Sequence, residues 1–215
     1  VRARQVALRL PTIALQASNA SVLFHPARAM GESLTAATTD FLSYFTQFGA
    51  AHSEAPRMCY HLVSPPTSPG GSKLTLFRSL VSQFGGANLP FFAQNVFNIL
   101  INWALREFDL VDRSLVLAEA TRNEDLRLWL VAREEVACEL AHSEAKAYGA
   151  AGVPLSDAQL VSSLTRHRVE QQRLLSVTGY VDDKEAVAVG RERAFRWLVC
   201  FLSVCLKTGV KVAPE

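Results

Sequence analysis

The chain has 215 residues, of which 49% are hydrophobic and 20% charged, and its formal net charge is +2. This hydrophobic content argues against a disordered chain, and the near balance of charge argues against nucleic acid as a partner, which would need a clustered basic surface. The four cysteines are scattered and form no Cys-x-x-Cys pair, so neither a disulfide-rich secreted domain nor a structural zinc site is predicted.

Residues 1–30 form an arginine-rich, acid-poor arm. It contains Arg2, Arg4, Arg9 and Arg28, and the first carboxylate of the chain is Glu32. Cationic N-termini with Ser and Ala are typical of organellar targeting segments, because a membrane potential that is negative inside draws them inward. The arm therefore predicts a mitochondrial protein at the inner membrane or its matrix face. A plastid location and a plain basic arm are the alternatives.

Residues 31–108 are predicted to be an apolar helical region. Between residues 31 and 51, apolar side chains recur at steps of three and four and predict one face of a helix: Leu34, Ala37, Phe41, Leu42, Phe45 and Phe48. Residues 64–72 hold three prolines and two glycines, which predicts an exposed loop. A second, short amphipathic helix is expected over residues 76–84, before Gly85 and Gly86.

An uncharged stretch runs from residue 79 to residue 105 and is long enough to cross a bilayer. Within it, Asn95, Asn98 and Asn102 are spaced i, i+3 and i+7 and therefore share one face of a helix. Unpaired amides are costly in hydrocarbon, so this face must meet protein or water. We interpret it as a polar interface on a soluble or partly embedded helix, with a membrane span as the alternative.

Residues 109–215 are predicted to be a charged helical region that ends in an apolar helix. Thr121 and Glu124 have the spacing of a capping box, so two helices should meet near Asn123. Ser156 and Gln159 predict another capped helix, which would end at Gly179. The last helix is expected to start near residue 182. Its uncharged part, residues 197–206, is too short to span a bilayer.

The predicted fold class is all-α. Six or seven helices would form an irregular bundle, with one or two of them embedded in or lying against a membrane. Alternation with a period of two residues is nearly absent, so little β-sheet is expected.

No catalytic motif stands out. Glu139 and His142 have the Glu-x-x-His spacing of helical di-iron sites, but such a site needs a second pair, and no other histidine has a glutamate three residues before it. Nucleophile-elbow, Walker-type and dinucleotide-binding glycine patterns are missing as well. We predict no enzyme, no metal site and no cofactor.

Two groups of basic residues are candidates for contact with an anion or a lipid headgroup. Arg166, His167 and Arg168 are consecutive, whereas Arg191, Arg193 and Arg196 precede the apolar residues 197–206. Cations that flank an apolar helix suit a surface of anionic lipid. The ordinary alternative is a set of solvated helix faces.

Residues 84–100, with the sequence FGGANLPFFAQNVFNIL, resemble the glycine-containing turn and even-numbered helix of a mitochondrial carrier repeat, especially that of ADP/ATP carriers. Residues 40–62, which include Pro56, resemble the odd-numbered helix that leads into the proline-centred signature. Within this resemblance over residues 40–108, Arg57 stands where the family signature has an acid. Residues 110–190 also offer no span. The resemblance therefore implies a relic fold kept for assembly, without transport.

The sequence favours a non-catalytic accessory subunit of a mitochondrial inner-membrane complex, such as a respiratory-chain or ATP-synthase assembly. Its partners would be other protein subunits, with membrane lipid as a further candidate. Two alternatives stay open. One is a carrier-like or ligand-binding helical bundle that uses the Asn95, Asn98 and Asn102 face, and the other is a soluble, self-assembling coat or scaffold protein.

Overall fold

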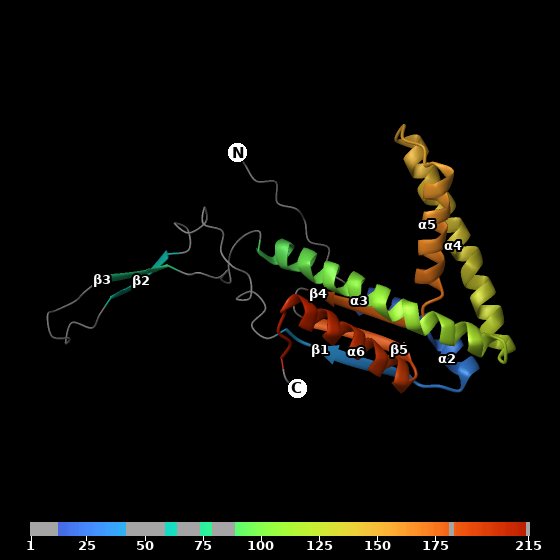
Figure 1. The fold of residues 1–215 in the computed structure, drawn as a ribbon, viewed down its shortest axis with the longest axis horizontal. Helices are drawn as coiled ribbons and strands as arrows, with labels where there is room; N and C mark the ends of the chain where they lie inside the picture. The colour runs from blue at the N-terminus through green and yellow to red at the C-terminus, as the bar shows by residue number, and fades with distance from the viewer. Residues whose placement is uncertain (1–12, 42–58, 64–73, 79–88, 181–182, 214–215) are drawn as a thin grey trace.

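The computed structural model describes residues 13–41, 59–63, 74–78, 89–180 and 183–213, and the fold is predominantly helical as expected (Figure 1). The helices among these residues are α1 (Ile13–Ser21), α2 (Phe24–Met30), α3 (Leu89–Ala120), α4 (Glu124–Ala150), α5 (Asp157–Gln171) and α6 (Arg191–Thr208). The strands are β1 (Leu34–Thr39), β2 (Cys59–Val63), β3 (Leu74–Arg78), β4 (Leu175–Tyr180) and β5 (Asp183–Val189).

A small antiparallel sheet with the strand order β1-β5-β4 joins residues 34–39 to residues 175–189. Leu34 pairs with Val189 across β1 and β5, and Leu175 pairs with Ala188 across β4 and β5. Strands β2 and β3 form a separate antiparallel pair. The sheet places residues from both halves of the sequence in a single core.

The main core lies between the three-stranded sheet and the helices α3 and α6. Its centre is aromatic. Phe201 stacks on Trp197, with ring centroids 5.9 Å apart, and also lies 5.9 Å from Phe41. Phe108 and Trp197 form a T-shaped pair with ring centroids 6.2 Å apart. These rings hold α6 against α3 and thereby fix which face of α6 points outward.

A second core lies where α2, the end of α3 and the start of α4 meet, and it includes Leu23, Ala27 and Leu126. Asn123 joins these elements. Its side-chain oxygen accepts from the backbone N–H of Leu126 at 3.0 Å, and its amide donates to the carbonyl of Ala29 at 2.7 Å. The end of the arginine-rich arm is therefore part of the folded structure.

Helices α4 and α5 form a hairpin that projects away from the sheet (Figure 1). Polar contacts line its interface. Arg168 donates to Glu134 at 2.5 to 2.8 Å, and Arg133 donates to the side chain of Gln171. Ala137 is fully buried and lets the two helices approach closely.

Three predictions for the charged region can be compared directly with the structure. The break between two helices at Asn123 is confirmed, but Asn123 itself caps α4, whereas the Thr121 hydroxyl donates to the carbonyl of Ala118. The capping box of Ser156 and Gln159 is confirmed at the start of α5. That helix ends at Gln171, and the predicted continuation to Gly179 is wrong because β4 begins at Leu175.

Other helix predictions are corrected by strands. Residues 34–39, expected in a helix, form β1, and residues 74–78 form β3, whose backbone pairs with β2. The last helix begins at Arg191, and residues 183–189 before it form β5. Tertiary pairing overrides local periodicity here, since each of these short segments gains a ladder of backbone hydrogen bonds from its partner strand.

The connection from β5 to α6 depends on Gly190, which has a φ of 84°. Its N–H donates to the carbonyl of Ser33 at 2.9 Å, and a Cβ there would lie 3.1 Å from the Glu32 carboxylate. A side chain would therefore strain this turn, and the glycine lets α6 start directly above the sheet.

Several expectations fall on residues outside the described ones, namely residues 1–12 of the arm, residues 42–51, the loop at 64–72, and residues 79–88 of the uncharged stretch. The strand β2 occupies residues 59–63, at the end of the segment that resembles an odd-numbered carrier helix. Across the described ranges, every helix is either too short or too polar to pass through a bilayer.

Candidate interaction site

The outer face of α6 carries a row of exposed apolar side chains. Phe195, Val199, Leu202 and Leu206 are 66%, 50%, 44% and 83% exposed. Their steps of four, three and four residues match the spacing of core positions in a coiled coil. The opposite face of the same helix is buried in the main core, so α6 is apolar on two sides. We call these four residues the α6 apolar row.

The sequence prediction missed this row. The sequence predicts one apolar helix with cationic ends and does not separate the inward face of the helix from its outward face. The heptad spacing is visible in the sequence, but only the buried positions of Trp197 and Phe201 reveal which apolar residues are left outside.

The predicted amide face is present on α3. Asn95, Asn98 and Asn102 are all exposed, and Gln94 donates from its side-chain amide to Asn98 at 2.9 Å. These amides lie on one side of the helix, as the spacing requires, and they face away from the aromatic core. They extend the polar surface beside the exposed Ile99.

Asp112, about two turns before the end of α3, is buried and accepts hydrogen bonds from two arginines of α6. Arg193, itself buried, donates its Nε to the carboxylate oxygens at 2.9 Å, and Arg196 donates to the same carboxylate. Arg193 also donates to the carbonyl of Val189 at 2.5 Å. Arg191 is exposed and lines an open hollow together with Arg196. Two of the three cations before the apolar stretch therefore pair with Asp112 inside the protein, and Arg191 stays at the surface.

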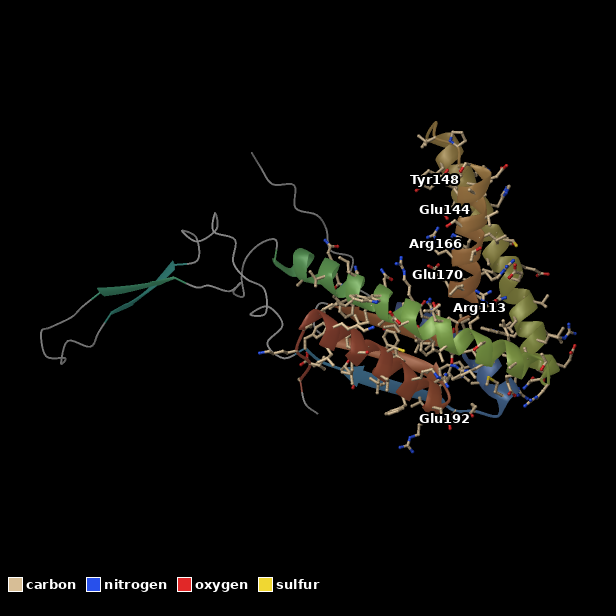
Figure 2. The ribbon with its side chains drawn as sticks, viewed as in Figure 1. Arg113, Glu144, Tyr148, Arg166, Glu170 and Glu192 are labelled. Atoms are coloured by element: carbon tan, nitrogen blue, oxygen red, sulfur yellow. The ribbon has the colours of Figure 1, made fainter. Side chains whose placement is uncertain are left out.

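The other basic group lies on the hairpin and is largely neutralised within it. Glu144 accepts from Ser163 and Arg166, each at 2.5 Å, and lies 3.0 Å from the Nε2 atom of His167. Arg168 is paired with Glu134. Figure 2 shows Glu144 and Arg166 on facing helices of the hairpin. These residues hold α4 and α5 together.

The hydrogen bond from Ser163 is the main cause that lowers the pKa of Glu144 below its ordinary value of 4.5, followed by the contacts with His167 and Arg166. A carboxylate whose pKa is lower in the folded state stabilises that state above the unfolded pKa and loses this contribution as the pH falls. We therefore expect the hairpin to lose thermal stability as the pH falls below about 4.5.

Circular dichroism melts between pH 3 and pH 7 would test this expectation. The variant Glu144→Gln should melt at a lower temperature than the wild type at pH 7 and should converge with it at pH 3. Glu139→Gln, at an exposed position on the same helix, is the matched control and should follow the wild type throughout. Parallel curves for wild type and Glu144→Gln would contradict the role of the carboxylate.

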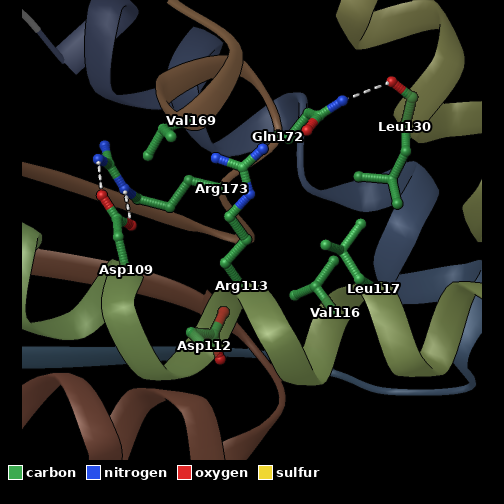
Figure 3. A pocket seen from close by; sticks show the side chains of 9 residues that line it. All are labelled: Asp109, Asp112, Arg113, Val116, Leu117, Leu130, Val169, Gln172 and Arg173. Carbon is green, nitrogen blue, oxygen red and sulfur yellow. Dashed lines mark hydrogen bonds and ion pairs between the residues drawn. The ribbon is translucent and has the colours of Figure 1, made fainter. Parts of the chain in front are cut away.

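A narrow pocket lies in the inner angle between α3 and the hairpin (Figures 2 and 3). The space inside it is about 20 Å³, which is enough for about one water molecule. The lining is apolar on one side and charged on the other, and it comprises Asp109, Asp112, Arg113, Val116, Leu117, Leu130, Val169, Gln172 and Arg173. Arg173 donates to both oxygens of Asp109, at 2.8 and 2.6 Å.

Within the described ranges, no group of three or more His, Cys, Asp or Glu residues could hold a metal ion. Glu139 and His142 are both exposed on α4. Comparisons of the chain with protein-family models, with curated proteins and with solved structures find no match.

Proposed function

We propose that the protein is a non-catalytic accessory subunit that joins a larger assembly through the α6 apolar row. The row is the observation that supports this role. Single exposed apolar residues are common on protein surfaces, but a continuous row at heptad spacing is the surface that a partner helix covers. The exposed amides of α3 provide polar contacts of the kind found at the rim of such interfaces.

The location and the assembly are part of the same proposal. The arginine-rich residues 1–30 support import into a mitochondrion, where the protein would attach to the matrix face of an inner-membrane complex such as a respiratory-chain or ATP-synthase assembly. Attachment would run through protein contacts of α6. Membrane lipid beside the exposed Arg191 would be a secondary contact.

The variant Leu202→Asp tests the proposal. Placing a carboxylate in an interface both removes apolar burial and adds a desolvation cost, so we expect association to weaken at least tenfold. Extraction of native membranes with a gentle detergent, followed by size separation, would show the wild-type chain in a large complex and the variant as a small species. The melting temperature of the purified variant should match that of the wild type.

Leu128→Asp on α4 is the matched control, because Leu128 is 52% exposed and lies outside the α6 apolar row. It should migrate with the large complex. The proposal fails if Leu202→Asp also stays in the large complex, or if the wild-type chain itself migrates as a small species. Formation of the large species by the purified chain alone would instead favour the scaffold role.

A further inference from the structure

The α6 apolar row lies open to water in the single chain, on the face of α6 that points away from the aromatic core. An open hollow adjoins the first half of the row and is lined by Arg191, Glu192, Phe195, Arg196 and Val199. A continuous apolar surface of this kind marks a face that another molecule covers. The row therefore favours association even when the chain is free of its assembly.

The spacing of the row is complementary to itself when two copies of α6 run in opposite directions. Phe195 of one copy then faces Leu206 of the other, and Val199 of one copy faces Leu202 of the other, in four layers. Leu206 of the second copy would insert into the hollow beside Phe195 and Val199. A two-fold axis relates the two copies, and such an interface closes on itself, so it gives a dimer instead of a filament.

The charges around the row also favour the antiparallel arrangement. In a parallel pair, Arg191 of each copy would face Arg196 of the other, and these like charges repel. The antiparallel pair separates the arginines to opposite ends of the interface. It places Glu192 of each copy at the end that carries Lys207 of the other, and it sets the two helix dipoles against each other favourably.

Glu192 and Lys207 are both available for such a contact. Glu192 is exposed, and no hydrogen bond or ion pair joins it to the other residues that the structure describes. The Lys207 side chain is 52% exposed, and its Nζ atom lies 4.0 Å from Glu107. Arg196 and Lys207 both reach carboxylates of α3, and Glu192 precedes Arg196 by one helical turn, so Glu192 and Lys207 lie on the same side of the row. Opposite charges therefore meet at each end of the antiparallel pair.

We propose that two copies of the free chain form a closed dimer in which their α6 apolar rows pack antiparallel, with Val199 of each copy facing Leu202 of the other. The dimer rests on the proposed function only in that the row is an interface, and it gives the row a partner before the assembly does. Four layers make a small interface, so we expect a Kd of about 10 μM, which is weak enough for the assembly to displace the second copy.

Analytical ultracentrifugation of the purified chain would test the dimer. Between about 1 and 100 μM, the average mass should rise from that of one chain toward that of two. Leu202→Asp should raise the Kd at least tenfold, because it places a carboxylate opposite Val199 in both central layers. Leu128→Asp on α4 is the matched control and should keep the wild-type Kd. A wild-type chain that stays monomeric, a species larger than a dimer, or an unchanged Kd in Leu202→Asp would overturn the proposal.

Two complementary variants test the antiparallel register. Val199→Lys and Leu202→Asp each place a charge against an apolar side chain in both central layers, so each alone should dimerise at least tenfold more weakly than the wild type. An equimolar mixture should dimerise at least tenfold more tightly than either variant alone, because one central layer then pairs opposite charges and the other keeps its wild-type residues.

In a parallel dimer, position 199 of one copy would face position 199 of the other, so no layer of the mixture would pair opposite charges. A mixture that dimerises no better than its components would therefore overturn the antiparallel arrangement. Both variants should melt at the wild-type temperature, since Val199 and Leu202 are half exposed in the single chain.

The dimer and the accessory role fail under different results. If the purified chain is monomeric but migrates in a large complex from native membranes, the dimer is wrong and the accessory role stands. If the purified chain dimerises, and Leu202→Asp abolishes the dimer without releasing the chain from the large complex, the accessory role is wrong and the dimer stands.

Discussion

We expect Asp112→Asn to lower the free energy of unfolding by about 3 to 5 kcal/mol, which is the usual cost of leaving a buried charge without its partner. The Asp112 side chain is 4% exposed and that of Arg193 is 9% exposed, so water cannot replace the lost charge. Asparagine keeps the shape of the side chain and one acceptor oxygen, so the effect reports on charge and not on a cavity. Urea unfolding followed by circular dichroism would measure it.

The exposed pair of Glu124 and Arg127 provides the control for this prediction. Their side chains are 65% and 54% exposed, and they are joined at 2.5 Å. Exposed pairs contribute little because water screens them, so Glu124→Gln should leave the unfolding midpoint close to that of the wild type. A loss of stability in Asp112→Asn no larger than that in Glu124→Gln would contradict the buried position of the Asp112 cluster.

Phe201→Ala should destabilise the protein by about 3 to 5 kcal/mol, because it opens a cavity at the centre of the aromatic core. Phe201 is fully buried and contacts the rings of both Trp197 and Phe41. Thermal melting and urea unfolding of the purified variant would measure the loss.

Phe195→Ala, six residues earlier on the same helix, separates stability from assembly. Phe195 is exposed, so its truncation should change the free energy of unfolding by less than about 0.5 kcal/mol. The same truncation should weaken association if the α6 apolar row is the interface. A large loss of stability in Phe195→Ala, or a small one in Phe201→Ala, would mean that the helix is oriented differently.

Local signals in the sequence predicted the parts of the fold that local interactions form. The turn at Asn123 and the capping box of Ser156 and Gln159 depend on hydrogen bonds within three residues, and both helices begin where the sequence predicts. The predominantly helical composition of the fold follows from the same periodicity.

Strands β1 and β5 could not be predicted in this way, because each depends on a partner far away in the sequence. Leu34–Thr39 contains apolar residues at spacings that also fit a helix, and only pairing with residues 184–189 selects the extended conformation. The cluster of Asp112 with Arg193 and Arg196 could not be predicted for the same reason. Asp112 lies 81 residues before Arg193, and no spacing within a short window connects them.

The candidate sites were predicted unevenly. The common face of Asn95, Asn98 and Asn102 follows from helical geometry alone, and the structure shows that this face is exposed. In contrast, the accessibility of a basic residue depends on whether a carboxylate from another element reaches it. Glu144 pairs with Arg166, and Asp112 pairs with Arg193, whereas no described carboxylate pairs with Arg113. The charge pattern of the sequence shows none of these outcomes.

The antiparallel pairing of Leu34 with Val189 also sets an order of events during synthesis. β5 is the central strand of the sheet, so β1 has no partner until the ribosome has synthesised residues 183–189. At about 5 to 20 residues per second, β1 would wait roughly 8 to 30 s, and Phe41 would wait still longer for Phe201. A nascent chain of this protein thus exposes the edge of β1 during this interval, which makes it a natural client for chaperones that hold unfolded chains.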